Sequence, residues 1–240
     1  MKAQRPFIVI AGSAAPTTSE EAVAAAHQFV NLLVSEGLSK GYGFVVAFTN
    51  EPIHPNDENL ALTFDATVIR AIAKLAEAGT SKLRGRLQLV VNLDKWTSAY
   101  LEMGDSLTSS GDRDRETFRI AKRLVNEGIA TVVTIPDERW VGGRIREQQA
   151  ALADAMVSIG GGKGVLDLRG LLKEKSAPVL PIKSGFAGIL NDAEADRLLV
   201  PEFRNHPDHF IQVSPRPCAL HRAELAAIVE PCRLVNRSLI

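Results

Sequence analysis

The sequence predicts a Rossmann-like α/β fold, a three-layer sandwich in which helices cover both faces of a mostly parallel sheet. Apolar runs of strand length alternate with helical segments along the chain, and this order is typical of a parallel sheet. Each strand-length run is continuously apolar, so both of its faces are expected to be buried. Loops of small residues follow several of these runs, at the edge where such sheets bind ligands.

The predicted elements alternate from the N-terminus to about residue 199. Strands are expected at residues 7–11, 44–48, 87–93, 130–135, 156–159 and 178–182. Helices are expected at residues 19–35, 65–78, 115–127, 144–153, 165–173 and 192–199. Thr18 or Ser19 can cap the first helix, and Thr63 or Asp65 the second, because their oxygens accept hydrogen bonds from unpaired helix N–H groups.

Polar or glycine-rich segments separate these elements. Residues 49–63 are expected to form a loop, and residues 94–113 a mobile surface loop. Gly142-Gly143 is expected to break the chain before the fourth helix. Residues 1–240 are expected to form a single domain, a normal size for an α/β unit. Residues 205–240 are rich in Pro and Arg. They are expected to form a C-terminal extension, to which the sequence assigns no role.

The composition argues against several classes of protein. The formal net charge is +0, so no excess of cations is present for nonspecific nucleic-acid binding. The two cysteines, Cys218 and Cys232, are too few for a disulfide framework, which favours a reducing, cytoplasmic compartment. No stretch reaches the roughly 18 apolar residues of a membrane helix, and the N-terminal apolar run is too short for a signal peptide.

The most informative segment is a loop with four glycines in five residues, placed between a strand and a helix. Its residues are Gly160, Gly161, Gly162, Lys163 and Gly164. Glycine lets the backbone approach a ligand closely, and the following helix directs free N–H groups and its positive dipole end at the loop. The segment therefore predicts a phosphate site, with Lys163 as an added cation. The alternative is a tight turn without a ligand.

Two further loops follow strands. Gly12, Ser13 and Ala14 end the first strand, and Lys183 and Ser184 follow the last. Because the carboxyl ends of parallel strands share one edge of the sheet, the three loops are expected to converge on one ligand. The glycine loop is not a P-loop, since Gly164 follows the lysine, nor a clean dinucleotide fingerprint, since Asp167 replaces the third glycine.

These motifs together resemble the SLOG superfamily, which includes the LOG phosphoribohydrolases and the DprA core. The resemblance runs from Ile8 to about Ala187 and rests on Ile10-Ala11-Gly12-Ser13, Gly160–Gly164 and Pro181-Ile182. It looks closest to the branch associated with TIR and sirtuin effectors in antiphage defence. In that branch an Arg-Glu pair opens the helix before the penultimate strand, and Arg146-Glu147 is similar to that pair.

The resemblance also implies a lost catalytic group. LOG enzymes carry a Pro-Gly-Gly-x-Gly-Thr-x-x-Glu motif, and here Gly160 replaces the Pro, Val165 the Thr and Leu168 the Glu. Asp167 stands one position away and would point about 100° elsewhere on the helix. Because N-glycosidic cleavage needs a carboxylate, the resemblance implies a binding domain without catalytic residues.

The leading expectation is a sensor of a nucleotide-derived signal, such as ADP-ribose or a cyclic isomer, with no resident cofactor. The resemblance implies a homo-oligomer and a TIR, sirtuin-like or other effector as partner. One alternative is a LOG-like nucleotide N-glycosidase with Glu147 or Asp167 as its carboxylate. Another is DNA binding of the DprA kind, which the neutral charge opposes. No metal site is expected, since Pro207 separates His206 and His209 and no other ligand pattern accompanies them.

Overall fold

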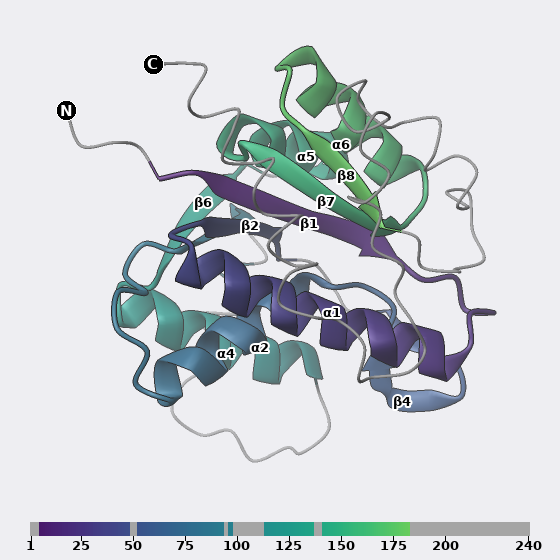
Figure 1. The fold of residues 1–240 in the computed structure, drawn as a ribbon, viewed down its shortest axis with the longest axis horizontal. Coiled ribbons are helices and arrows are strands. Elements are labelled where there is room, and N and C mark those ends of the chain that lie inside the picture. The colour runs from purple at the N-terminus through teal and green to yellow at the C-terminus, as the bar shows by residue number, and fades with distance from the viewer. Residues whose placement is uncertain (1–4, 49–51, 94–95, 98–112, 137–140, 183–240) are drawn as a thin grey trace.

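The computed structural model describes residues 5–48, 52–93, 96–97, 113–136 and 141–182, and it has the predicted Rossmann-like α/β architecture (Figure 1). Six strands form one parallel sheet in the order β6-β5-β2-β1-β7-β8. The strands are β1 (Phe7–Ser13), β2 (Gly43–Ala47), β5 (Leu87–Asn92), β6 (Ala130–Ile135), β7 (Ala155–Gly160) and β8 (Val179–Ile182).

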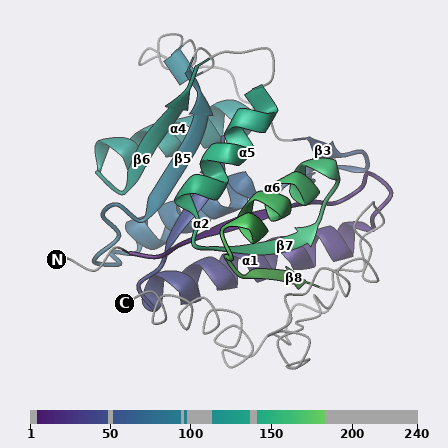
Figure 2. The same cartoon turned by 90° about the horizontal axis from the view of Figure 1, so that it is seen from above.

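Helices cover both faces of this sheet. One face carries α1 (Glu20–Ser39), α2 (Asp65–Glu77) and α4 (Arg113–Asn126), and the other carries α5 (Val141–Leu152) and α6 (Lys163–Glu174). Seen from above, α5 and α6 lie side by side across their face (Figure 2). Within the described residues, no helix is long and apolar enough to cross a membrane.

The strand order reverses direction once, between β1 and β7. The chain runs outward from β1 through β2 and β5 to β6, and then returns through α5 to place β7 on the other side of β1. The pairing of β1 with β7 extends to Ser13 opposite Gly160. The carboxyl ends of the two strands therefore lie next to each other, at the position where open parallel sheets bind ligands.

Each face of the sheet has its own apolar core, because successive strand residues point to opposite faces. In β1, Ile8 and Ile10 pack into the core beneath α1, α2 and α4, whereas Val9 packs into the core beneath α5 and α6. All three side chains are at most 1% exposed. This two-sided burial explains why the strands are continuously apolar in the sequence.

Two predicted features of the segment that follows β2 are wrong. Residues 49–63 contain a short antiparallel hairpin, β3 (Ile53–His54) and β4 (Asp57–Ala61), in place of a simple loop. A contact with the segment before α1 holds the hairpin in place, since Nε2 of the buried His54 lies 2.8 Å from the Thr18 carbonyl oxygen. Neither Thr63 nor Asp65 caps α2, whose N-cap is Phe64 with no side-chain hydrogen bond.

The prediction for the glycine pair before the fourth helix is also wrong. Gly142 and Gly143 lie inside the first turn of α5, which begins at Val141. A glycine costs a helix only about 1 kcal/mol, and α5 offsets this cost by packing on β2, β5 and α6. The Ser19 cap is confirmed, since its hydroxyl accepts a hydrogen bond from the Ala22 N–H at 3.3 Å.

Several predicted features lie outside the described residues. They are most of the 94–113 loop, the helix at 192–199, Lys183, Ser184, His206, His209 and the 205–240 extension. Among the described residues, no group of three or more His, Cys, Asp or Glu side chains is arranged to hold a metal ion.

Candidate functional site: a cavity where the strand order reverses

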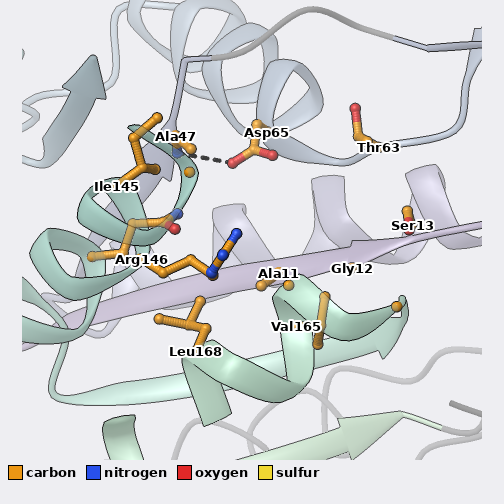
Figure 3. Close-up of a pocket in the computed structure, with 14 residues that line it drawn as sticks. Ala11, Gly12, Ser13, Ala47, Thr63, Asp65, Ile145, Arg146, Val165 and Leu168 are labelled. Carbon is orange, nitrogen blue, oxygen red and sulfur yellow. Dashed lines mark hydrogen bonds between the residues drawn. The ribbon is translucent and has the colours of Figure 1, made fainter. Parts of the chain in front are cut away.

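A cavity of about 410 Å³ opens at the carboxyl ends of β1 and β2 (Figure 3). Its volume lies within the range of small-molecule sites. Five segments line it: the end of β1, the end of β2, the start of α2, α5, and the glycine loop with the first half of α6. The lining residues are Ala11, Gly12, Ser13, Ala47, Thr63, Asp65, Gly142, Ile145, Arg146, Gln149, Gly162, Gly164, Val165 and Leu168.

The walls combine apolar surface with a few polar groups. Ala11, Ile145, Val165 and Leu168 form apolar wall, and Leu168 is only 2% exposed. Polar side chains enter from β1, the start of α2 and α5, so they surround the apolar part from different elements. This mixture is typical of a site that holds a flat organic group and orients it by a small number of hydrogen bonds.

Arg146 brings a positive charge to this cavity. In Figure 3 its side chain extends from α5 toward Ala11. One guanidinium nitrogen lies 3.3 Å from the position that a Cβ would occupy at Gly164, so the missing side chain leaves room for the arginine. The guanidinium also forms an ion pair with Asp167, with 3.4 Å between Nη2 and Oδ2. Arg146 is half-buried, at 24% side-chain exposure.

The N-terminus of α6 faces the same cavity. Its N-cap, Gly162, has an extended backbone and supplies no side chain to the unpaired N–H groups of the first turn. Gly162 and Gly164 both line the cavity. An uncapped helix N-terminus attracts anions through these N–H groups and the helix dipole. Arg146 and the start of α6 therefore form one region suited to a phosphate or another anion.

The other two loop glycines are required by backbone conformation. Gly160 and Gly161 have φ of 57° and 105°, values that side-chain-bearing residues rarely adopt. A Cβ on Gly161 would also collide with the side chain of Val165. The glycine loop therefore serves two purposes. Gly160 and Gly161 form its tight turn, and Gly162 and Gly164 line the cavity.

Asp65 is the one carboxylate among the described lining residues. Its Oδ1 accepts a hydrogen bond from the Ala47 N–H at 3.0 Å, which fixes the carboxylate at the end of β2 (Figure 3). Leu168, at the position of the LOG glutamate, presents only an apolar wall. Asp167 is absent from the lining and 40% exposed.

The structure brings together part of the predicted site. Gly12, Ser13, Arg146, Gly162 and Gly164 line the cavity. Five other predicted residues stand apart from it.

Ala14 is buried beside the cavity, and its N–H donates to the Leu62 carbonyl oxygen at 2.8 Å. Lys163 is exposed at the first position of α6. The Glu147 side chain points away from the cavity that Arg146 enters, because neighbouring helix residues point about 100° apart. It is exposed, and its carboxylate pairs with the Arg144 guanidinium at 3.2 Å. Gly160 and Gly161 shape the turn without lining the cavity.

Sequence reasoning missed Asp65 and Gln149 as site residues. A signal for Gln149 was present, since positions 142, 145, 146 and 149 follow the i, i+3, i+4, i+7 spacing of one helix face. The sequence indicates Asp65 only as a helix cap. Its place in the cavity depends on the hairpin β3–β4 and the position of α2 against β2, neither of which the local sequence specifies.

Comparison with known proteins gives a family and two relatives. The model of a family described as "ATP nucleosidase Cap17-like, N-terminal" matches residues 3–209. Two proteins named ATP nucleosidase Cap17, from Escherichia coli and Escherichia coli strain KTE188, are each 28% identical over 203 residues. These alignments cover 84% of this chain and 36% of each relative, so the chain spans about a third of the relatives' length.

Among solved structures, the molybdenum cofactor carrier protein of Chlamydomonas reinhardtii is 14% identical, with a TM-score of 0.46. That match covers 96% of this chain and 99% of the carrier protein.

Proposed function

The chain belongs to the family of Cap17-like N-terminal domains, and on that basis we propose that it is a nucleotide-binding sensor domain. Its cavity would hold a nucleotide-derived signal, such as ADP-ribose or a cyclic isomer, with a phosphate at the start of α6. The relatives are named for an activity on ATP, which supports a nucleotide as the class of ligand. The resemblance to SLOG domains of antiphage systems supports a role in defence signalling.

One observation carries this proposal: a half-buried arginine and an uncapped helix N-terminus meet at the same cavity. Arg146 can form charge-assisted hydrogen bonds to phosphate oxygens, and the first-turn N–H groups of α6 can donate to the same group. The cavity lies beside the reversal of strand order, where folds of this class bind nucleotides.

Two features favour binding over catalysis. The carboxylate of the LOG motif is replaced by Leu168, whose apolar side chain is part of the wall. The relatives are also much longer, and the aligned region is only 36% of their length. The residues responsible for the activity in their name can therefore lie outside the region that aligns with this chain.

The proposal is tested by calorimetry and thermal unfolding with ATP, ADP-ribose, cyclic ADP-ribose, NAD, AMP and cyclic dinucleotides, followed by chromatography of the ligand. A sensor is expected to bind at least one of these and return it intact, with a melting temperature that rises with ligand concentration. Absence of binding across the whole panel would contradict the proposal.

Substitution of Lys163 by alanine is expected to weaken nucleotide binding by no more than about threefold, as for other exposed charges. Lys163 is exposed and outside the cavity lining, so it contributes mainly a screened attraction. Calorimetry at low and high salt checks this, and the small effect should vanish at high salt. A loss of tenfold or more would show that the lysine contacts the ligand directly.

A second candidate function is nucleotide N-glycosidase activity with Asp65 as the carboxylate. The observation behind it is the position of Asp65 in the cavity wall, together with the activity in the relatives' name. A carboxylate there could stabilise positive charge on the ribose as the base departs.

Under this second candidate, the Asp65→Asn variant should release free adenine from ATP at least about a hundredfold more slowly than the wild type. The Glu147→Gln variant is the matched control, because Glu147 is an exposed carboxylate that pairs with Arg144. Chromatography of ATP incubated with each protein measures the release. No adenine from the wild type would exclude this candidate and leave the sensor proposal in place.

We also propose that the ligand acts through a homo-oligomeric interface, since a ligand shifts an equilibrium only when it prefers one state. Light scattering coupled to gel filtration, with and without the bound nucleotide, tests this. An unchanged monomer under both conditions would contradict it.

A further inference from the structure

Gln149 is a buried amide in the wall of the cavity. It lies on α5 one turn after Ile145 and Arg146, and it is 5% exposed. Its side-chain amide makes no hydrogen bond within the described part of the chain. The amide therefore stays available to hydrogen-bond a molecule that enters the cavity. Its placement against a cavity indicates that a bound molecule supplies the missing hydrogen bonds.

The surroundings of Gln149 suit the base of a nucleotide. Ile145 and Leu168 give the cavity apolar walls, against which a flat ring can pack. Arg146 lies on the same face of α5, one turn before Gln149, and its guanidinium reaches Gly164 at the start of α6. A nucleotide with its phosphate at Arg146 and α6 can therefore place its base along the same face of α5, toward Gln149.

We propose that Gln149 reads the edge of a purine base and makes the site selective for adenine over guanine. This inference rests on the proposed function and adds the class of base. The carboxamide has one acceptor oxygen and one donor nitrogen, which match the N6 amino group and N7 of adenine. Guanine presents acceptors at both N7 and O6, so the carboxamide oxygen would face O6 without a hydrogen bond.

The test compares two variants of neighbouring glutamines. Gln149→Leu removes the amide and keeps a similar volume, and Gln148→Leu is the matched control, because Gln148 is only half-buried and absent from the cavity lining. Calorimetry measures the affinities of wild type and variants for ATP and GTP, and for cyclic di-AMP and cyclic di-GMP.

The wild type is expected to bind the adenine member of a pair roughly tenfold or more tightly than the guanine member. In Gln149→Leu this preference should fall to about one, through loss of adenine affinity, while Gln148→Leu should keep it. The melting temperature of Gln149→Leu without nucleotide should equal or exceed that of the wild type, because the substitution removes no hydrogen bond within the described residues and adds apolar surface to the cavity wall.

Three results would overturn the inference. They are equal wild-type affinity for the two bases, an unchanged preference in Gln149→Leu, and a marked drop in the melting temperature of ligand-free Gln149→Leu, which would make the amide a structural group. In each of these cases nucleotide binding by the wild type would still support the proposed function. If the wild type binds none of the tested nucleotides, the proposed function fails as well.

Discussion

Replacement of Arg146 by alanine is expected to weaken nucleotide binding by about 10- to 100-fold, the effect of removing charge-assisted hydrogen bonds to a phosphate. Among the described lining residues Arg146 is the one cationic side chain, so no neighbour there can replace it. Isothermal calorimetry with the tightest-binding nucleotide of the panel measures the change. Stability without ligand should change by less than about 1 kcal/mol, because the half-buried Arg146–Asp167 pair is worth little.

The matched control for this prediction is Arg144→Ala. Arg144 lies on the same helix, is more than half exposed, and pairs with Glu147 outside the cavity. Its removal should leave affinity unchanged within about twofold, since it contributes only a screened charge. Equal losses in the two variants would indicate a general electrostatic effect and would contradict a direct role for Arg146.

Replacement of Gly12 by alanine is expected to destabilise the fold by about 3 kcal/mol or more. A Cβ at Gly12 would overlap the carbonyl oxygen of Ile159 on the adjacent strand. Relief of that overlap requires movement of the main chain of β1 or β7 in the middle of the sheet. Urea unfolding without nucleotide, followed by circular dichroism, measures the loss.

Gly170→Ala is the control for the glycine prediction. Gly170 lies within α6, and a Cβ there would meet no atom within 4 Å. Alanine is favoured over glycine in a helix, so this variant should be more stable than the wild type by roughly 0.5–1 kcal/mol. If Gly12→Ala were as stable as the wild type, the close approach of β1 and β7 would be disproved.

The sequence predicted the sheet well because its strands are buried on both faces. A continuously apolar run such as Val45–Ala47 in β2 has few alternatives to a central strand. The glycine loop was predicted for a similar reason, since Gly160 and Gly161 adopt conformations that other residues avoid. In both cases the residues that predict the structure are consecutive in the sequence, and few other conformations suit them.

The remaining features depend on contacts between distant segments. Pro52 precedes the hairpin β3–β4 and Pro55 lies in its turn, and His54 stabilises the hairpin by a contact with Thr18, 36 residues away. Asp65 enters the cavity only because α2 packs against β2 and the Ala47 N–H binds its carboxylate. Arg146 was predicted from a resemblance that includes Glu147, but the two side chains point about 100° apart on the helix, and only Arg146 lines the cavity.

The pairing of β1 with β7 also determines when the chain acquires its cavity during folding. Ile8 pairs with Ala155, and the Phe7 N–H donates to the Asp154 carboxylate, a separation of 147 residues. Contacts of such long range form slowly. Through α4 and β6 a growing chain has a first strand that can pair only with β2, and it lacks the cavity walls that α5 and α6 supply. Under the proposed function, a nucleotide would therefore stabilise the finished domain alone, and its binding would report that the last quarter of the described chain has folded onto the first strand.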